Sequence, residues 1–297
     1  MGEIRVFEPG DAESAVSLLA ELVPTTVHTP ESLRWREGAE PGRRSWVALE
    51  GEEVIGFATS FMQLWTEEQG KSRVWAGVRE DRRRQGIGSA LWERALDHAR
   101  KARRHTTEVD GDPAGLAFVE HRGFTEYDSE VMSSFDPAAC LLEPKPHEGF
   151  GVVRLDELGE RDEDLFRFYG AAGGIPPGAP ITFEHFRSFI LGNPTLDPPT
   201  SVVVLDDGGR IVSLSWLLVD RMRARAENEW TATLPKLRGR GLARLAKLEA
   251  IRRAAEAGIR EVTTGNAPDN APMRALNRRL GYRELYIRKD LELRTAS

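Results

Sequence analysis

The sequence predicts an α/β protein built from two tandem copies of one domain, each a sheet flanked by helices. The first observation is an internal repeat, in which WAGVREDRRRQGIG (75–88) resembles WTATLPKLRGRGLA (230–243) at one constant offset. The second is that strand-like and helix-like segments alternate within each half. The third is a Pro- and Gly-containing stretch between two halves of ordinary domain size. We therefore predict domains at residues 1–137 and 150–297, joined by a linker at 138–149.

Local signals place the elements of the first half in order along the chain. Apolar or alternating runs predict strands at residues 4–7, 45–49, 53–61 and 73–78. Apolar residues at helical spacing predict helices at residues 12–22 and 86–102, and a further helix opens at Pro30. Thr29 suits the N-cap of that helix and Pro30 its first position, because a proline there gives up no hydrogen bond. The second half repeats this order, with residues 241–257 as the counterpart of the last helix.

Composition and charge exclude several classes of protein. The chain has 297 residues, and its 41 Lys and Arg against 47 Asp and Glu give a net charge of −6. This sign does not suit a protein whose main partner is nucleic acid or an anionic membrane, so we expect neither partner. The single cysteine, Cys140, excludes an internal disulfide, and the histidines lack the spacing of metal ligands. With no long apolar segment in the sequence, we expect a cytoplasmic protein without a metal.

A predicted strand, a short loop rich in Arg and Gly, and a predicted helix follow one another once in each half. The loops are RRQGIG at 83–88 and RGRGLA at 238–243. The first turn of a helix has unpaired N–H groups, and small residues there let an anion reach the backbone. The flanking arginines add charge-assisted hydrogen bonds, so each loop suits a pyrophosphate. Neither loop has the G-x-G-x-x-G pattern of a Rossmann site or the pattern of a P-loop.

The two loops resemble the coenzyme A loop of the GNAT superfamily of N-acetyltransferases, in which R/Q-x-x-G-x-G/A opens a helix after a strand. An Asn-rich segment and a helix then lead to Leu280-Gly281-Tyr282, as they lead to Leu-Gly-Phe in that family, and Asp112-Pro113 leads similarly to Gly123-Phe124. Two fused domains of this kind also resemble the layout of mycothiol synthases and antibiotic-cluster acyltransferases. The resemblance implies two tandem GNAT domains, each a mixed, mostly antiparallel and splayed sheet flanked by helices.

The resemblance also implies a cofactor, acetyl-CoA or another acyl-CoA, and direct transfer of its acyl group to an amine. In the first half it implies cofactor-binding roles for Val78, Arg83, Arg84, Gln85, Gly86, Ile87, Gly88 and Ser89. In the second half it implies them for Thr233, Arg238, Gly239, Arg240, Gly241, Leu242, Ala243, Asn266 and Asn270. Val78 and Thr233 are strand positions, where the backbone would pair with the pantetheine arm as with another strand.

A general base is expected on the central strand. In histone-acetyltransferase relatives a glutamate lies nine positions before the loop, a place that Glu229 holds in the second half and Val74 in the first. Glu227 would share the face of Glu229 under strict alternation and is the second candidate. Beside Trp230 we expect Glu229 to lie away from water, with its pKa raised by desolvation. Glu229 and Glu227 are therefore the predicted catalytic residues.

Other positions bear on which half is active. Asn266 and Asn270 are neutral and suited to pantetheine amides, whereas the first half offers Glu108 and Asp112 near a negative cofactor. This contrast favours the second half. The slot that holds a tyrosine acid in many relatives contains Val119 in the first half and Asn277 in the second, so no general acid is assigned.

The leading hypothesis is an N-acetyltransferase that acts on an amine of a small molecule, with the second domain catalytic. Catalysis by the first domain, a non-catalytic CoA-binding or interaction protein, and a protein- or ribosome-directed acetyltransferase stay open as alternatives. The acceptor is expected to be selected by residues 23–42 and 170–193, the second of which is a Gly- and Pro-rich candidate lid. Because the domain is duplicated within one chain, we expect a monomer with an internal pseudo-dimer.

Overall fold

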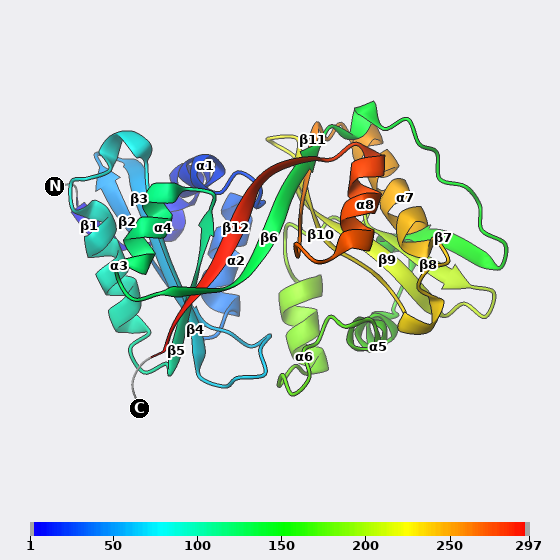
Figure 1. Cartoon of the computed structure of the whole chain (residues 1–297), viewed down its shortest axis with the longest axis horizontal. Helices are drawn as coiled ribbons and strands as arrows, with labels where there is room; N and C mark the ends of the chain where they lie inside the picture. Colours follow the sequence, from blue (N-terminus) through cyan, green and yellow to red (C-terminus); the bar gives the residue numbers. More distant parts are fainter. Residues whose placement is uncertain (1–2, 295–297) are drawn as a thin grey trace. The chain divides into compact units, whose positions relative to one another are not determined.

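The computed structural model describes residues 3–294, and the chain divides into two compact units (Figure 1). Unit 1 contains the described residues up to Glu130, residues Gly178–Pro180, and the described residues from Tyr286 onward. Unit 2 contains Val131–Pro177 and Ile181–Leu285. Six consecutive strands of a 12-stranded sheet lie mainly in each unit, and helices pack against them, as the sequence predicts.

In unit 1 the strands of this sheet follow the order β1-β2-β3-β4-β5-β12, with β12 belonging to unit 1 from Tyr286 onward. Its strands are β1 (Glu3–Val6), β2 (Arg44–Glu50), β3 (Glu53–Met62), β4 (Lys71–Val78), β5 (Arg104–Asp110) and β12 (Arg283–Arg294). Its helices are α1 (Ala12–Leu22), α2 (Pro30–Ala39), α3 (Ile87–His98) and α4 (Pro113–Glu120). The pair β4–β5 is parallel and the other neighbours are antiparallel. Alternate residues of β2 enter a core under α1 and a core under α3, so the sheet is covered on both faces.

In unit 2 the strands follow the corresponding order β7-β8-β9-β10-β11-β6, with β6 belonging to unit 2 from Val131 onward. Its strands are β7 (Phe150–Arg154), β8 (Val202–Asp206), β9 (Ile211–Asp220), β10 (Arg225–Thr233), β11 (Glu261–Asn266) and β6 (Thr125–Phe135). Its helices are α5 (Asp162–Ala172), α6 (Phe183–Phe186), α7 (Leu242–Glu256) and α8 (Ala271–Leu280). The pair β10–β11 is parallel and the other neighbours are antiparallel. Helices and strands therefore follow one another in the same order in both halves, which confirms the tandem α/β architecture.

The closing strands of the two halves are exchanged between the units. β12, the last strand of the second half, pairs with β5 from Arg288↔Asp110 to Arg294↔Arg104. β6, the last strand of the first half, pairs with β11 from Val131↔Asn266 to Phe135↔Val262. The compact units thus differ from the predicted halves 1–137 and 150–297 by their closing strands, and the boundaries of an independently folding domain stay a prediction.

Local signals fixed most helix starts. The Thr29 hydroxyl accepts from the Ser32 N–H at 3.1 Å and Pro30 holds the first position of α2, as predicted. The helix predicted at 86–102 is shorter, because α3 ends at His98 and the backbone of Ala99 is no longer helical. Within residues 3–294, no helix is both long enough and apolar enough to cross a membrane.

Candidate active site

In each unit the two parallel strands pair only at their beginnings. β4 pairs with β5 over Lys71–Arg73, and β10 pairs with β11 over Arg225–Glu227. Beyond these residues the strands separate, which is the splay that the sequence predicts. The backbone groups on the separated edge of each central strand are therefore available to an extended ligand that adds like a strand.

β10 contains an irregularity that β4 lacks. Glu227 lies opposite Leu218, but Trp230 lies opposite Trp216, so β10 holds one residue more than β9 in this interval. β4 pairs with β3 from Met62↔Ser72 to Gly56↔Val78 without a register shift. The extra residue is a β-bulge at the point where β10 leaves β11, and bulges re-aim side chains beside active sites.

Asn228 holds the bulge in place. Its side-chain amide donates to the Ser215 hydroxyl at 2.9 Å and to the Trp216 carbonyl at 3.1 Å. Its side-chain oxygen accepts from the Thr231 hydroxyl at 3.0 Å, and its backbone carbonyl accepts from the Thr264 hydroxyl at 3.1 Å. Sequence reasoning missed this residue, because its partners lie on two other strands or across the bulge.

The bulge decides the position of the predicted base. In β4, Val74 is 0% exposed in the core under α3. In β10, Asn228 follows the buried Ala226 on the same face and takes that inward place, which leaves Glu229 exposed. The expectation that Glu229 lies away from water is therefore wrong, and the desolvation argument built on it does not apply.

Glu227 is buried at the foot of the splay. Leu218, opposite Glu227, and Trp216, opposite Trp230, lie on one face of β9, the face on which Tyr169 of α5 stacks over Trp216. The predicted sharing of this face by Glu227 and Glu229 presupposes strict alternation, which the bulge interrupts between them. The catalytic roles of both residues stay predictions.

The two Arg/Gly loops follow the same backbone path. Arg84 and Gly239 are left-handed, with φ of 65° and 79°, and Gly86 and Gly241 follow with φ of 82° and 81°. Neither α3 nor α7 has a side chain that caps its first N–H groups. These N–H groups and the positive end of the helix dipole suit a bound phosphate, so both loops fit a diphosphate on their geometry.

Some of the remaining loop residues connect the loop to its unit, and others face solvent. Arg83 Nε donates to the Val78 carbonyl at 3.2 Å, and Arg238 Nε donates to the Thr233 carbonyl at 3.3 Å, so each arginine ties its loop to the central strand. Ile87 and Leu242 are core residues, which leaves only their backbone for a ligand. Arg84, Gln85 and Gly239 are exposed, Gly88 and Ala243 are half-buried at the helix start, and the Ser89 hydroxyl accepts from Arg122 at 3.1 Å.

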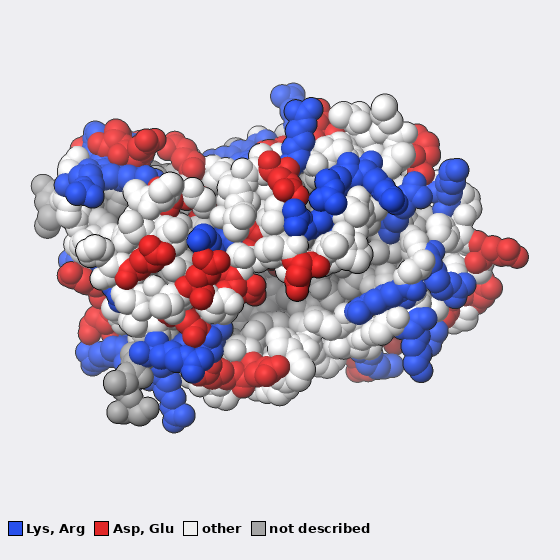
Figure 2. Space-filling model, viewed as in Figure 1, with Lys and Arg blue, Asp and Glu red and all other residues white. Residues whose placement is uncertain are grey.

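The loops differ in how their charges are compensated. In unit 1, Arg83 pairs with Asp112 at 3.1 Å and Arg82 with Glu50 at 2.6 Å. In unit 2, no ion pair of the described residues involves the basic side chains around the loop, Lys236, Arg238, Arg240 and Arg244. Figure 2 shows Lys and Arg side chains gathered where Figure 1 draws the start of α7. At the second loop an anion therefore meets four basic side chains without an ion pair, whereas at the first only Arg84 is without one among the described residues and Arg82 and Arg83 are already paired.

The segment after β11 brings asparagines together beside the splay. The Asn266 side-chain oxygen accepts from the Asn277 side-chain amide, and the Asn277 oxygen, in a residue 3% exposed, has no hydrogen-bond partner among residues 3–294. A pantetheine amide would supply the missing donor. Asn270 caps α8 by accepting from the Met273 N–H at 3.3 Å, so the structure gives it a local role as well.

The corresponding region of unit 1 is filled by charged side chains. Arg73 pairs with Glu108 of β5 and with Asp290 of β12, at 2.9 Å for the latter. Burial raises the pKa of Asp290, and Arg73 opposes this rise. Tyr286 also lies in unit 1, where its hydroxyl is 2.8 Å from the Thr25 hydroxyl and burial raises its pKa to about 12. The first half thus replaces the neutral lining of the second by an ion-pair network.

Comparisons with known proteins agree with this geometry. A family model described as the acetyltransferase (GNAT) family matches residues 15–124 and 163–282, once in each half. A tandem GNAT protein from the clavulanic acid biosynthesis pathway is similar in structure, with 20% identity, a TM-score of 0.75, and coverage of 100% of this chain and 99% of that one. A GCN5-related N-acetyltransferase from Sphaerobacter thermophilus has 19% identity and a TM-score of 0.73 over 99% of this chain and 96% of that one. A comparison with curated proteins finds no match, and no group of described residues forms a candidate metal site.

Proposed function

The chain belongs to the acetyltransferase (GNAT) family, and we propose that its second domain transfers an acetyl group from acetyl-CoA to an amine of a small molecule. The observation that carries this proposal is the bulge in β10, which presents Glu229 to solvent beside the splay, whereas Val74 is sealed in the core. The uncompensated positive charge around 238–243 supports cofactor binding in the same unit. Acetyl-CoA, when bound, supplies the acetyl group as a thioester.

The residues of unit 2 divide the work of such a transfer. The N–H groups at the start of α7 and Arg240 hold the diphosphate, and the separated edge of β10 orients the pantetheine arm. Glu229 would take the proton from the acceptor amine, directly or through water, so that the nitrogen lone pair can attack the thioester carbonyl. The C–N bond forms as the C–S bond breaks, and CoA leaves as a thiolate that takes up a proton. No cysteine nucleophile is needed, and Cys140 packs beside the core under α7.

The face of β10 beside α5 supports a small acceptor. Tyr169 lies 4.8 Å from Trp230 and 5.2 Å from Phe186, measured between ring centroids, and Trp216 lies 5.3 Å from Trp230. Trp230 is part-exposed and the other three rings are buried. This packed cluster of aromatic rings favours a compact amine over an extended peptide as acceptor.

We also propose that the chain acts as a monomer, with a mass in solution near 33.1 kDa.

A pair of matched variants tests the assignment to unit 2. Ala243→Glu and Gly88→Glu each place a carboxylate in the first turn of the loop helix, where acidic residues favour the helix but repel a phosphate. We expect Ala243→Glu to abolish acetyl-CoA binding in calorimetry and thiol release with a panel of small amines, while Gly88→Glu retains both. The reverse result would assign catalysis to the first domain.

A further inference from the structure

The linker lies against the start of α7. A Cβ added to Gly241 would lie 3.1 Å from Nε2 of His147, a residue of the predicted linker 138–149. At the matching place in unit 1, a Cβ on Gly86 would meet nothing within 4 Å. The second loop therefore has an imidazole at its N-cap glycine, and in the described part of the chain the first loop has none.

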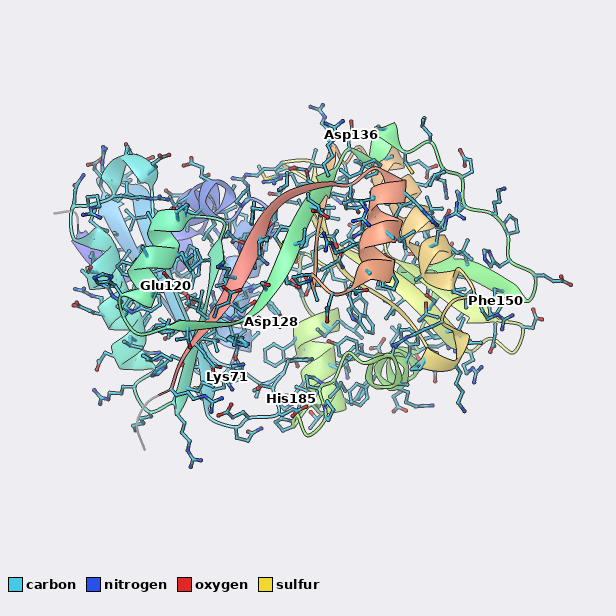
Figure 3. The ribbon with its side chains drawn as sticks, in the orientation of Figure 1. Lys71, Glu120, Asp128, Asp136, Phe150 and His185 are labelled. Atoms are coloured by element: carbon cyan, nitrogen blue, oxygen red, sulfur yellow. The ribbon has the colours of Figure 1, made fainter. Side chains whose placement is uncertain are left out.

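The imidazole is held by the linker itself. Its Nδ1 lies 3.1 Å from the Lys145 carbonyl, which can only accept, so Nδ1 carries a hydrogen. The His147 carbonyl accepts from the Phe150 N–H at 3.0 Å, and the Phe150 ring lies 5.0 Å from the Arg240 guanidinium. Figure 3 labels Phe150 at the start of β7, where the linker ends. These contacts leave Nε2 as the nitrogen that faces the helix start.

We propose that His147 is a further cofactor-binding residue, whose Nε2 donates a hydrogen bond to the diphosphate of acetyl-CoA bound at Gly241–Ala243. The inference rests on the proposed function of unit 2 and adds a group from outside the strand–loop–helix motif. Because Nδ1 donates to a carbonyl, a donating Nε2 makes the ring an imidazolium, and its positive charge joins that of Arg240. The linker then completes the second cofactor site, and glycine at 241 leaves room for the ring.

The test compares two ligands that differ in the diphosphate. Calorimetry measures the affinity of acetyl-CoA and of acetyl-pantetheine, which has no phosphate, for the wild type, His147→Ala and His147→Gln. A charge-assisted hydrogen bond is worth about 10- to 100-fold in affinity, so His147→Ala should weaken acetyl-CoA by that factor. Acetyl-pantetheine should bind all three proteins equally, and His147→Gln should recover part of the loss. His121→Ala, an exposed histidine of the first half, is the matched control and should change neither affinity.

Three results would overturn the inference while leaving the proposed function in place. His147→Ala could bind acetyl-CoA as the wild type does, or more tightly because the ring occupies the place of the phosphate. It could also weaken both ligands equally, which would indicate a structural role of the linker. If the wild type itself binds no acetyl-CoA, the proposed function fails and the inference fails with it.

Discussion

Lys247 predicts an unusual dependence of stability on pH. This residue of α7 is 1% exposed, and its ammonium group lies 4.9 Å from the Tyr282 ring centroid. Burial alone lowers its pKa from 10.5 to about 7, because the charged form loses its hydration and gains no carboxylate. In the unfolded chain the same amine keeps its ordinary pKa. The folded protein therefore binds fewer protons than the unfolded chain between about pH 7 and pH 10.5.

The sign and size of the effect follow from this difference. The free energy of unfolding should rise with pH through this window by about 1.4 kcal/mol for each pH unit. The change in the pKa of Lys247 from 10.5 to about 7 corresponds to about 5 kcal/mol of stability. The folded protein lacks this full amount below pH 7 and regains it above pH 10.5. The ring of Tyr282 attracts the charged form and offsets about 1–2 kcal/mol, which moves the lower end of this window up by about one pH unit and leaves a net penalty of about 3 kcal/mol at pH 7.

Lys247→Met removes the amine and keeps most of the volume. Urea unfolding followed by tryptophan fluorescence at several pH values should show the variant about 3 kcal/mol more stable than the wild type at pH 7. The difference should shrink toward pH 10.5 and vanish above it, because the wild-type amine then becomes neutral in both states. Lys101→Met, at an exposed lysine, should show no such trend. A difference between wild type and Lys247→Met that stays constant from pH 7 to pH 10 would refute the reasoning.

Two further predictions concern catalysis and folding. Glu229→Gln should lower kcat by a factor of about 10²–10⁴ without changing the affinity for acetyl-CoA, because only the base is removed. Val74→Ala, at the matching position of the repeat, should keep kcat and lower the free energy of unfolding by about 2 kcal/mol, because it leaves a cavity. Steady-state kinetics and calorimetry measure both, and normal turnover of Glu229→Gln would exclude it as the base. Residues 1–137 and 150–297 produced separately should each fold poorly, because each lacks the strand that closes its unit, and should regain their circular dichroism when mixed. Two halves that fold fully alone would contradict this.

The sequence predicted the features that depend on local backbone requirements. Gly86 and Gly241 open their helices with positive φ, a conformation that glycine adopts without strain. The repeated glycine in the sequence therefore indicates the same loop conformation in both halves. Thr29 and Pro30 likewise mark a helix start through their own hydrogen-bonding chemistry. Such signals need no knowledge of distant residues, and each of them is confirmed.

The features that sequence reasoning missed depend on distant partners. The bulge in β10 is fixed by Asn228, whose partners include Ser215 on β9 and Thr264 on β11. The position of His147 beside Gly241 depends on the path of the linker across unit 2. The exchange of β6 and β12 is also hidden, because two copies of one domain offer similar edges at β5 and β11, and pattern alone does not decide which copy pairs.

The two loops show why a repeat predicts geometry better than affinity. Their backbones match, since each loop has two left-handed residues separated by one other residue. Each is also followed by a helix whose first N–H groups have no side-chain cap. Their surroundings do not, since Arg83 already has Asp112 as a partner, while Arg240 lies against the Phe150 ring and forms no ion pair with the described residues. A diphosphate at the first loop must compete with that carboxylate, whereas at the second loop it gains the full attraction of the arginines. We therefore propose that the same backbone holds a cofactor in the second copy and serves as a structural turn in the first.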